Sequence, residues 1–100
     1  MSDVPVLSVI IPTYNRADTL RLCLRAFDRQ TTDRPFEIVV CDDGSADATG
    51  TVISHAVATG RIPVVHLRQE NAGANAARNR AIASARGARL LIVNDDTIPA

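Results

Sequence analysis

Short apolar runs alternate along the chain with longer segments whose apolar residues recur every three or four positions. The runs are rich in Val, Ile and Leu, which is typical of strands buried on both faces of a sheet. They predict four strands, at residues 6–11, 36–41, 62–67 and 90–93. Pro12 is expected to stop the first strand, and acidic or amide side chains break the second and the fourth.

The segments between the runs predict three helices. The first opens at Ala17 or Asp18, and its apolar residues follow the i, i+3, i+4, i+7 spacing of one helical face. The residues expected to face the core are Leu20, Cys23, Leu24 and Phe27. The other two helices are expected over residues 48–59, ended by Gly60, and 75–86, closed by Gly87.

This regular order of strands and helices predicts an α/β fold of β-α-β-α-β-α-β type. Strands that alternate with helices predict a parallel sheet with right-handed crossovers. The helices then lie on both faces of the sheet, in a Rossmann-like arrangement. The fourth strand has no following element to cover its far side. We therefore expect residues 1–100 to be the N-terminal part of a domain that continues beyond Ala100.

The amino-acid composition of the chain argues against several classes of function. Of the 100 residues 46% are hydrophobic, but only 3% are aromatic and none is Trp, so the core must be aliphatic. Eleven basic and eleven acidic residues give a formal charge of zero, which argues against a nucleic-acid binder and against attraction to an anionic membrane. Cys23 and Cys41 are expected to be small buried hydrophobes. With no signal peptide in the pattern, the expected compartment is the cytoplasm.

The segments that follow the strands are all polar. They are residues 12–16 (PTYNR), 42–45 (DDGS), 68–71 (RQEN) and 94–96 (NDD). Ligands of open α/β sheets bind outside the carboxyl ends of the strands, so these segments are expected to converge on one edge. A single polar loop means little in such a fold, whereas several loops with specific hydrogen-bonding residues favour a binding site.

The acidic residues in these loops have two interpretations each. Asp95 and Asp96 offer the hard oxygens that hold a divalent cation together with phosphate, or they form a turn and helix cap. The DDGS segment forms a tight turn at Gly44, with Ser45 or Asp47 capping the next helix. Alternatively, Asp43 accepts hydrogen bonds from a base N–H group or a ribose hydroxyl.

Other side chains are candidates for contacts with a nucleotide. Tyr14, the only Tyr, can stack on a base, and Arg78 can fork onto phosphate oxygens unless it is an ordinary surface arginine. Neither a G-x-G-x-x-G fingerprint nor a P-loop is present, so phosphates would need another charge partner. This raises the weight of the acidic pair as a metal site. His55 and His66 have no companion ligands nearby and are expected to be structural or exposed.

Taken together, four segments resemble the family 2 glycosyltransferases, which have the GT-A fold. They are SVIIPTYNRADTL (8–20), FEIVVCDDGSADAT (36–49), ENAGANAARNRAI (70–82) and LLIVNDDTIP (90–99). The last corresponds to the D-x-D region of that family. Each segment alone is a weak signal, but four in the right order and spacing, over nearly the whole chain, are a strong one.

The resemblance implies metal-assisted transfer of a sugar from a nucleotide-diphosphate sugar to an acceptor hydroxyl, with inversion. It implies a UDP-sugar as the first donor to consider and Mg²⁺ or Mn²⁺ as the cofactor. The nucleotide-sugar-binding residues that it implies are Pro12, Thr13, Tyr14, Asn15, Asp42, Asp43, Arg78 and Asp95. It implies Asp96 as the metal ligand. The acceptor and the pathway are left open.

The chain departs from the family pattern in two respects. Asn94 stands where many members carry the first Asp of D-x-D, and it brings no charge. The catalytic base is expected beyond Ala100, so the isolated chain is expected to carry the donor site and to be inactive. Any membrane association, at the inner face, is expected only through residues outside the chain.

Two other classes remain as alternatives. The first is a non-catalytic nucleotide-binding module related to the glycosyltransferases, which Asn94 favours. The second is a phosphoacceptor receiver domain, which has acidic residues after its first and third strands and a Lys near its end. Here the acidic residues follow the second and fourth strands and the chain has no Lys, which argues against a receiver.

Overall fold

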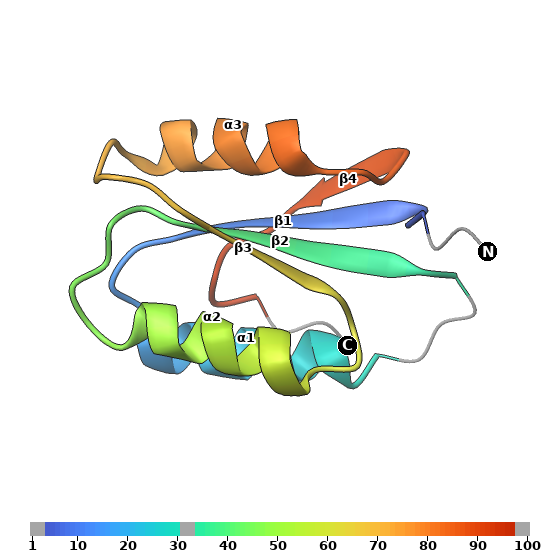
Figure 1. Ribbon diagram of the computed structural model, residues 1–100, viewed down its shortest axis with the longest axis horizontal. Coiled ribbons are helices and arrows are strands. Elements are labelled where there is room, and N and C mark those ends of the chain that lie inside the picture. The colour runs from blue at the N-terminus through green and yellow to red at the C-terminus, as the bar shows by residue number, and fades with distance from the viewer. Residues whose placement is uncertain (1–3, 31–33, 98–100) are drawn as a thin grey trace.

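A computed structural model describes residues 4–30 and 34–97 of the chain, and within these residues it contains a four-stranded sheet and three helices (Figure 1). The elements are β1 (Leu7–Thr13), α1 (Ala17–Asp28), β2 (Phe36–Asp42), α2 (Thr49–Thr59), β3 (Val64–Arg68), α3 (Ala74–Ser84) and β4 (Arg89–Ile92). All strand pairs are parallel, as the sequence predicts.

The order of strands across the sheet is β3-β2-β1-β4. The chain first moves outward from β1 to β3, and then crosses to the other side of β1 to form β4. Because right-handed crossovers in opposite directions lie on opposite faces, α1 and α2 cover one face and α3 covers the other (Figure 1). The direction reverses between β1 and β4, which is where open α/β sheets bind their ligands.

Apolar residues fill the space on both faces of the sheet. The cluster under α1 and α2 contains Val9, Ile11, Leu20, Cys23, Leu24, Phe27, Ile38, Val40, Val52 and Ile53. The cluster under α3 contains Ile10, Val39, Cys41, Ala77 and Ala81. The core is aliphatic apart from Phe27, and both cysteines are buried, which confirms the sequence prediction.

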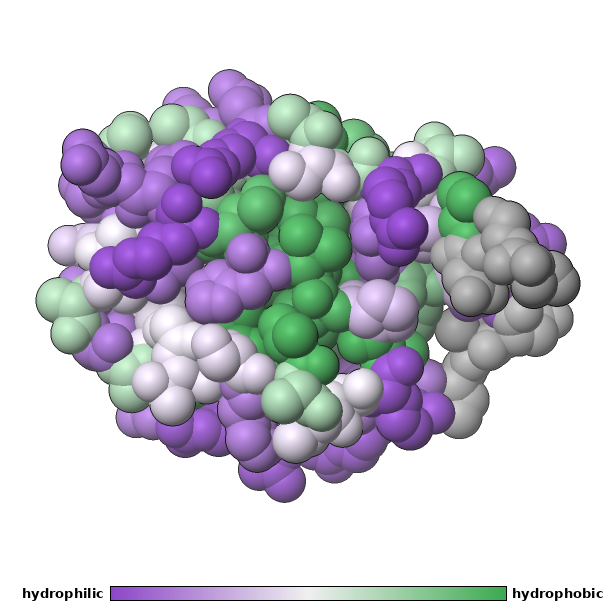
Figure 2. Space-filling view, in the orientation of Figure 1, coloured by the Kyte–Doolittle hydropathy of each residue, from purple (hydrophilic) through white to green (hydrophobic). Residues whose placement is uncertain are grey.

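The two edge strands are less buried than β1 and β2. Side chains of β3 are half-buried except for the exposed Arg68, and apolar residues gather over this strand in the centre of Figure 2. On β4, the side chains of Leu90, Leu91 and Ile92 are 43–47% exposed. Among the described residues, β4 is an edge strand that pairs only with β1.

Pro12 does not end the first strand, contrary to the prediction. The amide of Val93 donates to the Ile10 carbonyl, so the backbone N–H and C=O groups of the even-numbered residues of β1 point toward β4. The pairing of β1 with β4 ends at Ile10, before Pro12. The N–H group that proline lacks therefore breaks no bond within the described sheet. On the other side, the Thr13 carbonyl still accepts from the Asp43 amide, and the strand continues to Thr13.

The third helix ends at Ser84, two residues before its predicted end, so Gly87 does not close it. Gly87 is required for another reason, since a Cβ atom there would lie 2.6 Å from the amide nitrogen and the hydroxyl of Ser8. Close approach to β1 explains this glycine. None of the helices in the described segments is long and apolar enough to span a membrane.

Candidate functional site

The carboxyl ends of β1 and β4 are joined by a buried hydrogen bond between residues far apart in sequence. The Thr13 hydroxyl donates to Oδ2 of Asp95 over 2.9 Å, and both residues are more than nine-tenths buried. This bond fixes the carboxylate of Asp95 at the point where the strand order reverses. Asp96, the next residue, has a side chain that is 57% exposed.

Arg16 lies beside both members of this acidic pair. Its Nε atom is 3.7 Å from Oδ1 of Asp95, and its Nη1 atom is 3.9 Å from Oδ2 of Asp96. Arg16 belongs to the polar segment after the first strand, and no role is predicted for it from the sequence. The sheet order is the signal that reveals it, because β1 and β4 are neighbours and the loops that follow them lie side by side.

The acidic pair fits a cation that is shared with a ligand. One positive group, the guanidinium of Arg16, already lies within 4 Å of both carboxylates. Residues 4–30 and 34–97 contain no group of three or more His, Cys, Asp or Glu side chains arranged to hold a metal alone. Mg²⁺ typically takes one or two carboxylates from the protein and its other ligands from phosphate and water. Asp95 and Asp96 match that requirement.

The acidic loop lies against α1. Burial raises the pKa of the Cys23 thiol to about 11, and the negative charges of Asp95 and Asp96 contribute to the same direction. The thiol therefore stays neutral near pH 7 and packs as a small apolar group, as predicted. Burial likewise raises the pKa of Cys41 under α3.

Asp43 holds the segment that leads into α3. Its Oδ1 atom accepts from the Gln69 side chain and from the Ala72 amide, both at 2.8 Å. Its Oδ2 atom accepts from the Asn71 side chain and from the Gly73 amide, both at 3.0 Å. These bonds, with that from Gln69 foremost, keep the pKa of Asp43 below its usual value. Asp43 thus positions the loop, and its predicted contact with a base stays a prediction.

Asp42 is a buried support in this structure. Its side chain has no exposed surface, and its oxygens accept from the Ser45 amide at 2.9 Å and from Nη1 of Arg68 at 2.8 Å. Between them, Gly44 has φ of +79°, and a Cβ atom there would lie 2.9 Å from the Asn71 amide. The predicted tight turn at Gly44 is confirmed. The carboxylate of Asp42 is buried in this structure, and its contact with a nucleotide stays a prediction.

Asn15 connects the first loop to the second. It has a left-handed backbone, with φ of +49°, which Asn tolerates better than most residues. Its amide donates to the Ser45 hydroxyl at 2.8 Å, and its side-chain oxygen accepts from the Ala46 amide at 2.8 Å. The residue is predicted to bind the nucleotide-sugar, and the structure gives its side chain a part in shaping the loops.

Asp47 caps two helices. Its carboxylate accepts from the amide of Thr49, the first residue of α2, at 2.9 Å, and from the amide of Ala17, the first residue of α1, at 3.3 Å. The bonds from Thr49 are the main reason why the pKa of Asp47 lies below its usual value. Of the two predicted caps of the second helix, Asp47 is the one that bonds its first amide.

The remaining predicted residues lie around these supports. Tyr14 follows β1 and is 47% exposed, and Pro12 is half-buried in the strand before it. Arg78 lies in the second turn of α3, half-buried, and donates to the Asn75 side chain at 2.7 Å. No hydrogen bond or ion pair of the described residues joins Arg78 to the acidic pair. His55 on α2 is exposed and His66 on β3 is half-buried, in agreement with the prediction that they are structural or exposed.

Comparison with known proteins places this arrangement in a larger context. The family model described as "Glycosyl transferase family 2" matches residues 8–100. A putative glycosyltransferase EpsH of Bacillus subtilis is 36% identical over 95 residues, covering 94% of this chain and 27% of the relative. The validoxylamine A glucosyltransferase of Streptomyces hygroscopicus subsp. jinggangensis is 46% identical over 92 residues, covering 89% and 20%.

Two solved structures share the fold at 30% sequence identity. The mannosyltransferase PcManGT from Pyrobaculum calidifontis, in complex with GDP-Man and Mn²⁺, has a TM-score of 0.86 over 96% of this chain and 29% of its own. Residues 1–349 of Staphylococcus aureus TarS, in complex with UDP, have a TM-score of 0.82 over 90% and 27%. The chain thus spans 20–29% of the length of these four chains.

Proposed function

Because the chain belongs to glycosyl transferase family 2, we propose that its loops form the donor site of a metal-assisted glycosyltransferase that inverts the anomeric carbon. The observation that carries this proposal is the acidic pair at the reversal of strand order. Asp95 is fixed there by Thr13, and Asp96 stands exposed beside it. A fixed and a free carboxylate side by side suit a cation that must be shared with a diphosphate.

The chemistry that the site must support is the departure of a nucleoside diphosphate. A divalent cation held by Asp95 and Asp96 would supply Lewis-acid stabilisation of the negative charge that develops on this leaving group. Arg16, within 4 Å of both carboxylates, supplies a second positive charge at the same place. We assign to Arg78 the binding of phosphate oxygens by its guanidinium fork.

The nucleoside part of the donor would lie against the first two loops. Tyr14 has an exposed ring for stacking on the base. Asp43 and Asn15 hold the surrounding loops in place through their hydrogen bonds, so they preorganise this edge of the sheet. Support for a nucleotide-sugar comes from the similar structures solved with UDP, UDP-GlcNAc and GDP-Man. We propose a UDP-sugar as the donor to test first.

The catalytic base and the acceptor site are proposed to lie outside residues 1–100. This proposal is supported by the share of the similar proteins that the chain spans, 20–29%, which leaves most of their length for a base and an acceptor site. We accordingly propose that residues 1–100 alone bind nucleotide without transferring sugar. A cytoplasmic location also stays a prediction.

A second candidate function is a nucleotide-binding module without catalysis. Asn94 favours it, because an amide stands where the family often has a charged ligand. The two candidates differ in one measurable respect. Both bind the nucleotide-sugar, but only the enzyme releases the nucleoside diphosphate from it when an acceptor is supplied, which an assay of the full-length protein for nucleotide release measures.

The donor site is tested by thermal unfolding of the full-length protein with UDP, GDP or dTDP, each with Mn²⁺ or with EDTA. Saturation at about 100 times the dissociation constant stabilises the folded state by roughly 2.7 kcal/mol. We expect one nucleotide to raise the unfolding temperature only with Mn²⁺. Asp96→Asn should abolish the increase, and the control Asp18→Asn, an exposed carboxylate in the first turn of α1, should retain it. An equal increase in the Asp96 variant would contradict the assignment.

A further inference from the structure

The side chain of Arg16 bridges the two carboxylates of the acidic pair. Its Nε atom lies 3.7 Å from Oδ1 of Asp95, and its Nη1 atom lies 3.9 Å from Oδ2 of Asp96. These two nitrogens belong to one guanidinium group, so a single positive charge faces one oxygen of each carboxylate. Arg16 thereby offsets the repulsion between two neighbouring negative charges.

Arg16 is held in place by its backbone rather than by its side chain. Its amide donates to Oγ1 of Thr49 at 3.1 Å, and its carbonyl accepts from the amide of Leu20, in the first turn of α1, at 2.9 Å. The side chain is 52% exposed, and both of its distances to the carboxylates are longer than a hydrogen bond. The guanidinium group can therefore turn away from the acidic pair while the loop keeps its shape.

Arg16 faces the same oxygens that a divalent cation would use. Oδ2 of Asp95 accepts from the Thr13 hydroxyl, and Oδ1, which faces Arg16, is the oxygen that this hydroxyl leaves open. A guanidinium group a few ångströms from a divalent cation repels it, which in water weakens cation binding by about tenfold. Arg16 thus disfavours a cation that arrives alone.

With Asp95 and Asp96 as the proposed metal ligands, on which this inference rests, we propose that Arg16 neutralises the acidic pair until the diphosphate of the donor binds. A guanidinium group binds phosphate oxygens in a fork, and a diphosphate carries several negative charges. It therefore attracts Arg16 more strongly than carboxylates that lie beyond hydrogen-bond distance. Once Arg16 pairs with the phosphates, the carboxylates are open to the cation, so that cation and donor bind together.

This role differs in a measurable way from that of an ordinary surface arginine. Ion pairs between exposed groups contribute little, and a residue that only supports the shape of the site would weaken all binding when it is replaced. The proposed role requires two changes of opposite sign. Without the charge of Arg16, the acidic pair should bind a cation alone more tightly, but it should bind the nucleotide together with the cation more weakly.

The test measures these two affinities in the full-length protein and in its Arg16→Gln variant. Electron paramagnetic resonance reports the binding of Mn²⁺ alone. Calorimetry in the presence of Mn²⁺ reports the binding of whichever of UDP, GDP and dTDP raises the unfolding temperature. We expect the variant to bind Mn²⁺ alone about tenfold more tightly at low salt, with a smaller gain as salt screens the charge. Its affinity for the nucleotide should fall several-fold.

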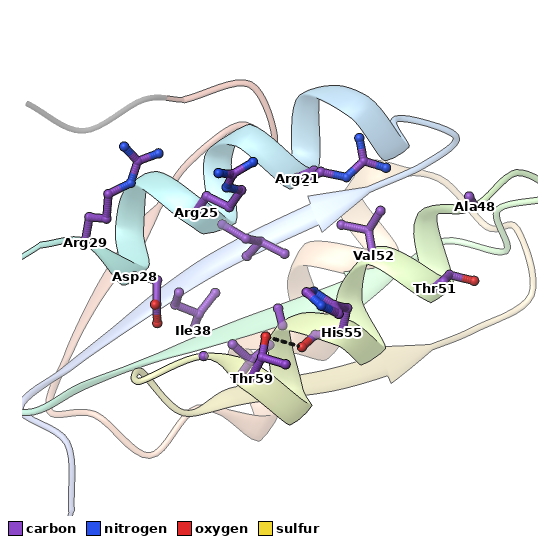
Figure 3. A pocket seen from close by; sticks show the side chains of 14 residues that line it. Arg21, Arg25, Asp28, Arg29, Ile38, Ala48, Thr51, Val52, His55 and Thr59 are labelled. Carbon is purple, nitrogen blue, oxygen red and sulfur yellow. Dashed lines mark hydrogen bonds between the residues drawn. The ribbon is translucent and has the colours of Figure 1, made fainter.

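Two further variants separate the charge of Arg16 from its shape and from general effects. Arg16→Lys keeps the positive charge, so it should bind Mn²⁺ alone almost as weakly as the unaltered protein. Arg21 is an arginine of similar exposure that pairs with Asp18 at 3.2 Å and lines a groove between α1 and α2 (Figure 3). None of the residues assigned to the donor site lines that groove, so Arg21→Gln should leave both affinities unchanged.

Three results would overturn the inference while the donor site stands. The first is equal affinity of the unaltered protein and Arg16→Gln for Mn²⁺ alone. The second is weaker binding of both Mn²⁺ and nucleotide in that variant, which would show that Arg16 only supports the shape of the site. The third is an equal gain in Mn²⁺ affinity in Arg16→Lys, which would exclude charge as the cause.

The proposed donor site is judged by a different variant. Metal-dependent nucleotide binding that persists in Asp96→Asn would contradict the donor site, whatever the Arg16 variants do. If no nucleotide binds with Mn²⁺ to the unaltered protein, both proposals are wrong. Urea denaturation reports whether each variant keeps the stability of the unaltered protein, so that a loss of affinity is not mistaken for a loss of fold.

Discussion

Each end of β2 carries a buried carboxylate that pairs with an exposed arginine, and the two pairs hold different parts of the molecule together. Glu37 near its start and Asp42 at its end both have side chains without exposed surface. Each pairs with an arginine whose side chain is more than half exposed, Arg86 at the amino end and Arg68 at the carboxyl end. An exposed partner lets a buried carboxylate keep its charge without burying a second ion.

The difference lies in what each carboxylate holds. Glu37 accepts from the Ser8 hydroxyl at 2.7 Å and from the Arg86 amide at 2.8 Å, and so ties β1 and β2 to the connection between α3 and β4. Asp42 supports the turn that presents Asp43, which in turn shapes residues 69–73. The amino end of the strand therefore closes the fold, whereas the carboxyl end uses the same kind of pair to prepare a site.

The largest effect is expected at the amino end. Glu37→Gln removes the charge of a carboxylate that accepts three hydrogen bonds. Buried hydrogen bonds to charged groups contribute most to the free energy of unfolding. We expect the free energy of unfolding to fall by about 3 kcal/mol, measured by urea denaturation at neutral pH. Nucleotide affinity, measured by calorimetry where the variant is folded, should not change. A parallel loss of affinity would show that the two ends are coupled, which contradicts the comparison.

At the carboxyl end, Asp42→Asn should cost less stability and more function. Two hydrogen bonds to the carboxylate are weakened, and we expect unfolding to become easier by about 2 kcal/mol. The turn at Gly44 loosens when these two bonds are weakened, so nucleotide affinity should fall several-fold as well. Arg68→Gln is the companion variant, and it should lower both quantities in the same direction. Unchanged affinity in both variants would make this end of the strand as purely structural as the other.

Acid should weaken the fold at both ends of the sheet. Hydrogen bonds lower the pKa of Asp43 and Asp47, and those from Arg86 and Ser8 outweigh burial to lower the pKa of Glu37 from 4.5. A lowered pKa in the folded state means that the stabilisation is complete above the usual value and is lost as the pH falls through the lowered one. As the pH is lowered below about 4.5, the urea concentration at the midpoint of unfolding should therefore decrease progressively. In Glu37→Gln this midpoint should decrease less steeply. If the midpoint of this variant decreased as steeply as that of the unaltered protein, Glu37 would be excluded as a source of the acid sensitivity.

The sequence predicted the frame of the molecule well because strands, helices and their order depend on local periodicity. It also predicted that the polar loops meet at one edge, since parallel strands bring their carboxyl ends together there. The cap at Asp47 was predictable because cap and amide are two residues apart.

The contacts between distant residues were not predictable. Glu37 stands inside an apolar run, and nothing near it in sequence indicates that Arg86, 49 residues later, will meet it. Asp42 and Asp43 are adjacent and chemically alike, but the alternation of side chains at the end of β2 directs them to different partners. The place of Arg16 beside the acidic pair likewise depends on which strands become neighbours. Such assignments require the sheet order, which periodicity alone does not fix.

The smallest expected effect on stability comes from Thr13, where the comparison can be made most selective. Thr13→Val keeps the shape of the side chain and removes the hydroxyl that donates to Asp95, so the free energy of unfolding should fall by about 1 kcal/mol. Asp95 is then no longer fixed for a shared cation. We expect calorimetry to show weaker nucleotide binding with Mn²⁺ and little change with EDTA, and Thr13→Ser should restore the metal-dependent part. Equal weakening in both conditions would mean that Thr13 supports the loop rather than the carboxylate.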